Sequence, residues 1–319
     1  MKALFAIVLS VASFCAAAQT FPDRPVRLIV AQPPGSSVDL QARLIAHRLT
    51  QAFDKQVLVD NRPGANGIVG LQELQRSKPD GYNYAMAAPS PMTVNQFIYK
   101  NLPYKPLEDF VPVSQLTTIT FVLVAHPSTP FKTVGELVSY AKAHPDKLNF
   151  CSSGVGNLSH LGSELLASEA GVKMRHIPAK GDAAALTDVI AGNTDFTMIT
   201  LPAAQPHIRS GKLKLIATAG RQRGSVFPDT QTIAEAGYPS VVIEGWSGII
   251  APAGTPPDII GRMHKELVRV FQTPEVRDTV TKQGSDPVAS SPEAFGAFMR
   301  AEAAKWQRVI KTSGVQLSE

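Results

Sequence analysis

Hydrophobic positions along the chain follow two alternating spacings. Residues 26–30, 56–59 and 82–87 are short apolar runs of the kind that form buried strands, whereas apolar residues recur at helical spacing across 42–53 and 68–74. Strands that alternate with helices in this order predict an α/β unit built on a doubly wound, mostly parallel sheet flanked by helices.

The same alternation restarts after residue 120. Further strands are expected at 121–125, 148–152, 174–177, 196–199 and 213–217. Helices are expected at about 133–144, 157–169, 182–191 and 202–210. Two apolar stripes beyond residue 260 predict C-terminal helices that pack on the first sheet. The chain therefore divides into lobe one, residues 19–120 and 221–319, and lobe two, residues 121–220, with two crossover strands as a hinge.

The first 18 residues have the order of a secretory signal peptide. A positive start (Met1-Lys2) precedes an apolar stretch (3–14) and three alanines (16–18), which favour a cut after Ala18. A membrane anchor would need ~20 apolar residues, more than this stretch contains. Export and removal of residues 1–18 leave Cys151 as the one cysteine, so the mature protein relies on its hydrophobic cores and has no internal disulfide.

Charge and composition argue against two classes of protein. The 31 Lys and Arg residues against 26 Asp and Glu give a net charge of +5, but no long basic block occurs, which argues against nucleic-acid binding. No apolar run of ~18 residues follows the leader, which argues against an integral membrane protein. A hydrophobic share of 44% is that of a globular protein with well-developed cores.

Three loops join a predicted strand to a predicted helix. Ligands bind there in open α/β sheets, because free N–H groups and the helix dipole favour anions. The first loop is residues 32–39, in which Gly35 lets the backbone approach a ligand. Ser36 and Asp39 have the spacing of a capping box, so Ser36 either caps the helix or contacts the ligand. Ser37 is expected to face the ligand.

The second loop, residues 151–161, follows a strand and opens a helix. It offers Ser153, Gly154 and Asn157 beside free amides, and Asn157 is either a ligand contact or only the N-cap. The G-x-G-x-x-S string at 154–159 is close to the dinucleotide fingerprint G-x-G-x-x-G. It lacks the third glycine and the acidic residue about 20 positions on, so no cofactor is predicted.

The third loop, residues 179–183, places Lys180 between a strand and a helix. Its ammonium group either binds a ligand carboxylate or stays solvated. Thr200 ends a further strand and is expected to join the same crevice.

Sequence signatures of enzymes are weak. GWSG at 245–248 is not the G-x-S-x-G nucleophile elbow. His160 and Glu164 lie one helical turn apart, but a third metal ligand is not evident. A Cys151–His160 dyad is disfavoured because Cys151 is expected to point into the core. We therefore predict a binding protein with no catalytic residue and no metal ligand.

Five segments, in order, resemble the tripartite tricarboxylate transporter receptors, the Bug family of periplasmic binding proteins. They are FPDRPVRLIVAQPPGSSVDLQARLIAHRL (21–49), VDNRPGANGIVG (59–70), KPDGY (78–82), FKTVGELVSYAKAHPDKLNFCSSGVGNLSHL (131–161) and GWSGIIAPAGTP (245–256). The resemblance covers the chain from about residue 21 to its end. It implies the two-lobed periplasmic-binding-protein architecture (type II-like) and a location in the periplasm.

The resemblance also implies a function. Such a receptor closes, as a monomer, over a small organic acid anion and delivers it to the membrane components of a tripartite transporter. In the family, the loops that correspond to 32–39 and 151–160 hold the carboxylate. Carried over by position, the implied ligand-binding residues are Ser36, Ser37, Ser153, Gly154, Asn157 and Thr200, with Asp39 orienting the first loop. Ser90 is a candidate reader of the ligand's other end.

The chain departs from the family's pattern at Ala179, where members often carry a Tyr. The missing ring enlarges the pocket, which favours a bulkier or aromatic carboxylate and leaves a di- or tricarboxylate as the other expected class. Two alternative functions stay open: an exported binding protein that feeds a sensor kinase, and an exported enzyme that uses the loop at 154–159.

Overall fold

The computed structural model describes residues 21–313, so the predicted signal peptide at 1–18 lies outside the described residues. The strands are β1 (Val26–Val30), β2 (Val57–Asn61), β3 (Asn83–Ala87), β4 (Phe110–Ala125), β5 (Asn149–Ser152), β6 (Arg175–Pro178), β7 (Phe196–Thr200), β8 (Lys214–Thr218), β9 (Glu244–Pro252) and β10 (Ser285–Pro287). The helices are α1 (Ser37–Phe53), α2 (Ile68–Gln75), α3 (Asn95–Ile98), α4 (Val134–Ala143), α5 (Leu158–Ala170), α6 (Asp182–Ile190), α7 (Leu201–Arg209), α8 (Pro257–Gln272), α9 (Pro274–Lys282) and α10 (Pro292–Ser313), with short turns η1 (Ala65–Gly67) and η2 (Ser90–Val94).

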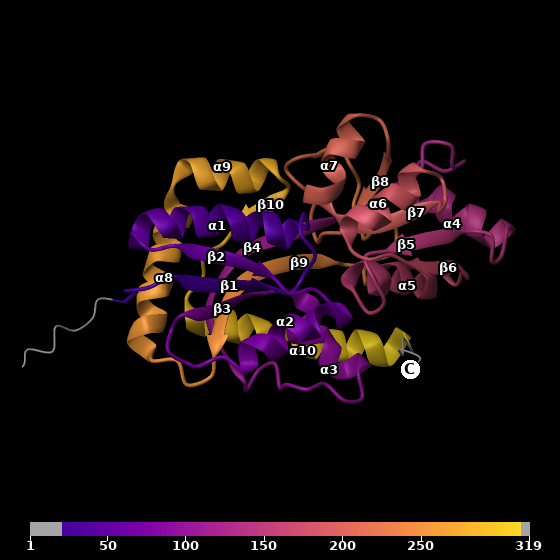
Figure 1. Cartoon of the computed structure of the whole chain (residues 1–319). Helices are drawn as coiled ribbons and strands as arrows, with labels where there is room; N and C mark the ends of the chain where they lie inside the picture. Colours follow the sequence, from indigo (N-terminus) through magenta and orange to yellow (C-terminus); the bar gives the residue numbers. More distant parts are fainter. Residues whose placement is uncertain (1–20, 314–319) are drawn as a thin grey trace, which may run out of the picture.

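The ten strands form one continuous sheet that runs through two lobes (Figure 1). Its order is β2-β1-β3-β9-β4-β7-β5-β6, and β8 and β10 pair with β4 off this path. Within lobe one β1 pairs in parallel with β2 and β3, and within lobe two β5 pairs in parallel with β6 and β7. The prediction of two α/β lobes flanked by helices is confirmed. The whole sheet is mixed rather than mostly parallel, because β4 pairs antiparallel with β7, β8, β9 and β10, and β3 pairs antiparallel with β9.

Alternating side chains of β1 explain how lobe one forms layers. Leu28 and Val30 pack in the core beneath α1 and α8, whereas Ile29 packs in the opposite core with Leu71 and Leu74 of α2. Successive residues of a strand point to opposite faces, so a strand with both faces covered is apolar throughout. Apart from Arg27, whose guanidinium pairs with Asp60 and Glu73, β1 is apolar, and this made it recognisable in the sequence.

The 16-residue strand β4 crosses from one lobe to the other. Its first part, from Phe110 to Thr120, pairs with β9, and its last part, from Phe121 to Ala125, pairs with β7. The sequence predicted only 121–125, because the preceding stretch is rich in Thr, Ser and Gln. Ser114, Gln115 and Thr117 are buried all the same, and Thr117 has hydrogen-bond partners on neighbouring elements.

The return crossing lies later than the predicted boundary at residue 220. Ile233, Val241 and Ile243 are buried in the core of lobe two. The N–H of Ile243 donates to the carbonyl of Ala219 at 2.7 Å, and the next residue, Glu244, already pairs with β4 in lobe one. The two connections therefore run side by side where the lobes meet, as a hinge requires.

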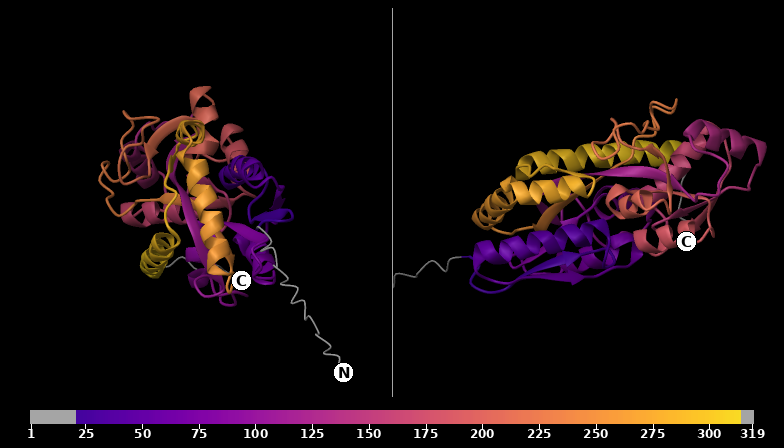
Figure 2. Two further views of the ribbon diagram at one scale, coloured as in Figure 1. Left: turned by 90° about the vertical axis from the view of Figure 1, so that its left-hand side faces the viewer. Right: turned by 90° about the horizontal axis from the view of Figure 1, so that it is seen from above.

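The C-terminal helix α10 also spans both lobes. Phe295 and Met299 are buried with the side chains of lobe one, and Trp306 and Ile310 belong to the core of lobe two. Figure 2 shows this helix extending along the molecule from lobe one toward lobe two. The prediction that the C-terminal helices pack on the first sheet therefore describes only the first part of α10.

Candidate functional site

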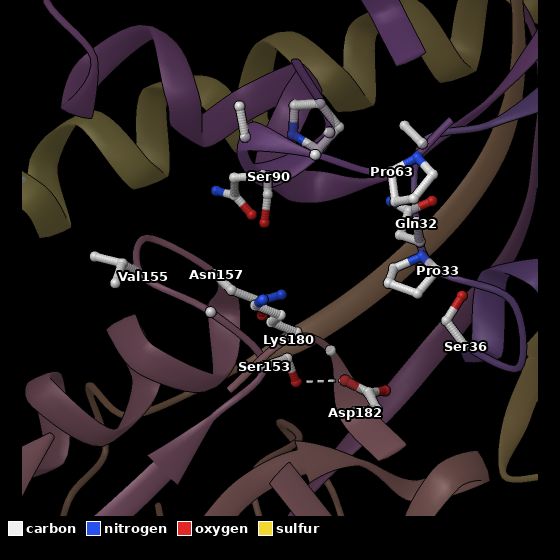
Figure 3. A pocket seen from close by; sticks show the side chains of 18 of the residues that line it. Gln32, Pro33, Ser36, Pro63, Ser90, Ser153, Val155, Asn157, Lys180 and Asp182 are labelled. Carbon is white, nitrogen blue, oxygen red and sulfur yellow. Dashed lines mark hydrogen bonds between the residues drawn. The ribbon is translucent and has the colours of Figure 1, made fainter. Parts of the chain in front are cut away.

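A cleft lies between the lobes, where the loops that follow β1, β5 and β6 face one another (Figure 3). Its main part is a cavity of about 680 Å³, and a smaller part of about 80 Å³ adjoins it. Five residues line both parts: Gln32, Ser36, Ser90, Asn157 and Asp182. Because these five are shared, the two cavities form one continuous site.

Four helices point their N-termini at the smaller cavity. Its wall includes Ser37 in the first turn of α1, Leu158 in that of α5 and Asp182 in that of α6. The N-cap of α7, Thr200, completes this group. The first N–H groups of a helix have no intrahelical acceptor and carry the positive end of the dipole. The smaller cavity therefore suits an anionic group the size of a carboxylate.

Asp39 fixes the conformation of the first loop without lining the cleft. Its carboxylate is buried and accepts the N–H of Gly35 at 2.8 Å, the amide of Asn61 at 2.9 Å and Nε of Arg43 at 3.0 Å. Burial alone would raise the pKa of Asp39, but these hydrogen bonds outweigh it and hold the pKa below its usual value. An ionised Asp39 thereby holds Gly35, which lies in the left-handed region with φ of +81°.

Ser36 combines both of the roles that its position left open. Its Oγ accepts the N–H of Asp39 at 3.2 Å, as an N-cap does, and the residue also lines both parts of the cleft. Asn157 does the same in the second loop. Its Oδ1 accepts the N–H of Ser159 at 3.0 Å, and it too lines both cavities.

The second loop is held from inside by side-chain hydrogen bonds. Ser159 Oγ accepts the N–H of Ser153 at 2.8 Å, and Ser152 Oγ accepts the N–H of Gly154 at 3.2 Å. Gly154 and Gly156 have φ of +139° and +74°, a backbone that residues with a Cβ rarely adopt. The loop therefore presents its backbone to the cleft in one fixed shape.

Beneath this loop lies a stack of aromatic rings. The rings of His160 and His176 are 3.9 Å apart between centroids, and Phe150 stacks on His176 at 4.9 Å. His176 Nε2 lies 2.6 Å from Ser152 Oγ, and His160 Nδ1 accepts the N–H of Gly156 at 3.1 Å. Burial, with a smaller effect of His160, lowers the pKa of His176 to about 4, so it is neutral at pH 7.

Asp182 is a site residue that the sequence analysis missed. It accepts hydrogen bonds from the hydroxyls of Ser153 and Thr200, the latter at 2.8 Å. Burial raises the pKa of Asp182, and the two hydrogen bonds act in the opposite direction. An acid in the first turn of a helix is ordinary, so the sequence pattern gives no reason to single it out.

The two lobes touch at two points. A Cβ built on Gly156 of lobe two would lie 2.4 Å from Ile98 Cδ1 of lobe one, and a Cβ on Gly181 would lie 3.3 Å from Pro33 Cγ. In this arrangement the cleft is closed at these two points.

The loop after β2 supplies part of the cleft wall on lobe one. Asn66 lies there with φ of +54°, in a conformation unusual for a residue with a side chain. Its amide donates to Asn95 Oδ1 at 2.8 Å, and the amide of Asn95 donates back to the carbonyl of Asn66 at 3.1 Å. Such strained backbone is common where a loop shapes a binding site.

Two buried polar atoms of cleft residues have no hydrogen-bond partner within residues 21–313. They are Oε1 of Gln32 and Nε1 of Trp246. Gln32 lines both cavities and Trp246 the smaller one. Buried polar groups are ordinarily paired, so these two atoms are candidates for contact with a ligand or with bound water.

Eight of the nine predicted ligand-binding residues lie on the cleft walls, and their role in binding stays a prediction. Ser153, Gly154 and Lys180 line the larger cavity, Ser37 and Thr200 the smaller one, and Ser36, Ser90 and Asn157 both. The ninth, Asp39, supports the first loop. Besides Asp182, the cleft is lined by four residues that were not predicted as ligand contacts: Gln32, Asn66, Tyr99 and Trp246. Asn66 falls in the PGANG stretch of a family motif, which was the one available signal.

Three residues were considered above for enzyme chemistry: Cys151, His160 and Glu164. Cys151 is buried, and desolvation, together with nearby Asp188, raises the pKa of its thiol to about 11. His160 Nε2 lies 3.7 Å from Glu164 Oε1, but the described residues contain no group of three or more His, Cys, Asp or Glu able to hold a metal ion. Between residues 21 and 313, moreover, helices long and apolar enough to cross a membrane are absent.

Comparison with known proteins assigns the chain to a family. The family model for the tripartite tricarboxylate transporter family receptor matches residues 41–315. The chain belongs to this receptor family. The resemblance found in the sequence is thus confirmed.

Relatives match the receptor over nearly its whole length. BugT of Bordetella pertussis is 34% identical over 320 residues, which cover 99% of the receptor and 98% of BugT. The structure of an R. palustris protein with adipate has a TM-score of 0.90 at 30% identity and covers 93% of the receptor and 99% of that chain. MatC from Rhodopseudomonas palustris with bound malate has a TM-score of 0.85 at 29% identity, over 91% of the receptor and all of MatC.

Proposed function

We propose that this receptor captures a small organic acid anion in the cleft and delivers it to the membrane components of a tripartite transporter. The observation that carries the proposal is the set of helix N-termini from both lobes around the cavity of about 80 Å³. A carboxylate placed there would accept hydrogen bonds from free backbone N–H groups and from the hydroxyl of Ser37. The larger cavity of about 680 Å³ would hold the rest of the molecule.

The bound relatives support the same class of ligand. The R. palustris protein holds adipate and MatC holds malate, and both share the fold of this receptor over most of its length. Each hydrogen bond to a charged group contributes ~1.5–3 kcal/mol net, so three or four contribute much of the ~8 kcal/mol that a micromolar affinity requires.

Closure of the lobes is the mechanism that we propose for capture. The two adjacent connections, within β4 and between Ile243 and Glu244, are the natural hinge, and the closed cleft removes the carboxylate from water. The anion is released when the lobes open again at the transporter. We further propose that residues 1–18 are removed after export and that the mature receptor acts in the periplasm as a monomer, without nucleic acid as a partner.

A thermal-melt screen of the mature receptor tests the proposal. The panel contains mono-, di-, tri- and aromatic carboxylates, with NAD as the probe for the enzyme alternative. A ligand at ~100 times its Kd stabilises the folded state by ~2.7 kcal/mol, which raises Tm by several degrees. We expect such a shift with at least one class of acid.

A pair of serine variants locates the binding in the cleft. Ser37→Ala should reduce the shift at equal ligand concentration, whereas Ser225→Ala, which changes an exposed serine outside the cleft, should leave it unchanged. A shift with NAD alone, or turnover of the bound acid, would contradict a receptor for carboxylates.

A further inference from the structure

The cleft contains an acidic side chain, although an acidic side chain is unfavourable in a site that binds anions. Lys180 and Asp182 are the charged residues among the described residues that line the two cavities, and their formal charges cancel. In the smaller cavity Asp182 is the charged residue, since Lys180 lines only the larger one. An ionised Asp182 would repel a second carboxylate placed beside it.

The hydrogen bonds around Asp182 determine what the wall of lobe two offers to a ligand. A hydroxyl has one proton to donate, and Ser153 and Thr200 both direct theirs to Asp182. The two hydroxyl oxygens can therefore only accept hydrogen bonds from a ligand in the cleft, through their lone pairs. The carboxylate of Asp182 accepts one hydrogen bond on each oxygen and keeps further acceptor capacity. This part of the wall accepts hydrogen bonds.

The opposite wall of the smaller cavity has the reverse character. Ser37 and Val38 begin α1 there, and their backbone N–H groups are among those that have no acceptor within the helix. The donors of α1 on lobe one thus share the smaller cavity with two acceptors on lobe two, Asp182 and Thr200, which stand beside the N-termini of α5 and α7. Ser153 lines the adjoining larger cavity. A ligand that matches both carries a carboxylate and, close to it, a group with protons to donate.

We propose that Asp182 is the specificity-determining residue of this receptor and selects ligands that carry a protonated amine beside the carboxylate. The ammonium group would donate to Asp182 and to the lone pairs of Ser153 and Thr200, while the carboxylate meets the N-terminus of α1. The preferred ligand is then a zwitterion such as an amino acid rather than a dicarboxylate. Burial raises the pKa of Asp182, and an ammonium group beside it would act in the opposite direction and favour the ionised form. The inference rests on the proposed function, since it specifies the class of acid that the same cleft holds.

Pairs of ligands that differ only in the amine test the inference. The probes are L-alanine and propionate, L-glutamate and glutarate, and L-phenylalanine and 3-phenylpropionate, each titrated into the mature receptor by calorimetry. In at least one pair we expect the amino acid to bind at least tenfold more tightly than its amine-free partner. Asp182→Asn should reduce this preference at least tenfold, because the neutral amide no longer attracts the ammonium group.

Asp188→Asn is the matched control. Asp188 lies on the same helix, lines neither cavity and contacts Cys151 and Asn193 instead, so its loss should leave the preference unchanged. Should Asp182→Asn fail to fold, Asp182→Ser serves as the second variant, and the ratio within each pair for the unaltered receptor decides without any variant.

The outcomes separate the inference from the proposed function. Equal or tighter binding of the amine-free acid in every pair that binds would overturn the role of Asp182 and leave a carboxylate receptor standing. An unchanged preference in a folded Asp182→Asn variant would overturn it as well. Absence of binding by every carboxylate and amino acid tested would instead contradict the proposed function itself.

Discussion

The carboxylate of Asp39 accepts the backbone N–H of Gly35 at 2.8 Å, although Asp39 itself lines neither cavity. Asp39 belongs to the first turn of α1, and Gly35 belongs to the loop before it. The helix therefore fixes the loop that precedes it, and through that loop the walls formed by Gln32 and Ser36. A residue outside the cleft thus determines part of its shape.

Asp39→Asn should weaken ligand binding by about tenfold and lower stability by about 2 kcal/mol, because a buried, charge-assisted hydrogen-bond set is lost. Calorimetric titration and denaturant unfolding measure the two effects. The exposed acid Asp229 supplies the control Asp229→Asn, for which neither quantity should change. Wild-type affinity in Asp39→Asn would mean that the first loop keeps its conformation without this carboxylate.

Gly156→Ala should impair closure of the cleft. Its new Cβ would lie 2.4 Å from Ile98 Cδ1 across the lobe boundary, so the closed form would be disfavoured and affinity should fall about tenfold or more. Gly171→Ala is the control, since Gly171 has a similar φ of +64° but open space around its Cβ position. It should lose stability through backbone strain and keep its affinity.

The double variant Gly156→Ala/Ile98→Ala separates strain from closure. If the clash with Ile98 is what weakens binding, removing that side chain should restore most of the affinity, and the strain common to both glycines should remain. Equal loss of affinity in Gly156→Ala and Gly171→Ala would argue that the lobes do not close at this point.

Ala179→Tyr should weaken binding of the native ligand. Ala179 lines the larger cavity, and a tyrosine ring would occupy part of the space available to the ligand's body. We expect the largest loss, about tenfold, for aromatic carboxylates and a smaller one for short acids. Titration of both classes into the two proteins measures this. Unchanged affinity for every acid would show that the ligand does not reach this wall.

His176 should make the receptor less stable in mild acid. Its pKa is about 4 in the folded protein and ~6.5 when unfolded, so the unfolded chain binds the proton first as pH falls. Stability is therefore intact above pH ~6.5 and decreases between ~6.5 and ~4, by at most about 3 kcal/mol from this group. Melts between pH 7.5 and 4.5 measure the slope.

His176→Phe keeps an aromatic ring in the stack and removes the titration. Its stability should depend less on pH over that interval than that of the wild type, while His47→Gln, at an exposed position, should keep the wild-type slope. Identical slopes for His176→Phe and the wild type would assign the acid sensitivity to other groups.

The helix starts and most of the strands were predictable because their signals are local. The capping-box spacing of Ser36 and Asp39 predicted the start of α1, where Ser36 Oγ accepts the N–H of Asp39. The start of α4 has the same local arrangement, in which the side-chain hydroxyl of Thr133 accepts the N–H of Glu136 at 3.2 Å. An N-cap residue and the residue whose N–H it accepts lie within one helical turn, so both can be recognised within a few consecutive positions of the sequence. Family motifs in the same segments then located the loops of the cleft.

The first part of β4 and the strand β9 were not predicted, since their burial depends on distant partners. Thr117 lies within hydrogen-bond distance of Gln41 on α1 and of Ser247 on β9. Polar side chains become core residues only when such partners surround them, and residues 41, 117 and 247 are brought together by the fold alone. A local apolar pattern does not reveal these distant hydrogen-bond partners.

Local features of the sequence were enough to predict the two α/β lobes, the loops that face the cleft and the family, because apolar periodicity, caps and motifs act over a few neighbouring residues. Tertiary structure decided what the cleft walls offer to a ligand. Ser153 follows β5, Asp182 opens α6 and Thr200 ends β7, so the direction of their protons is fixed only when three segments meet. A hydroxyl group can donate or accept a hydrogen bond. Its partner in the folded protein determines whether it acts as a donor or as an acceptor toward the ligand.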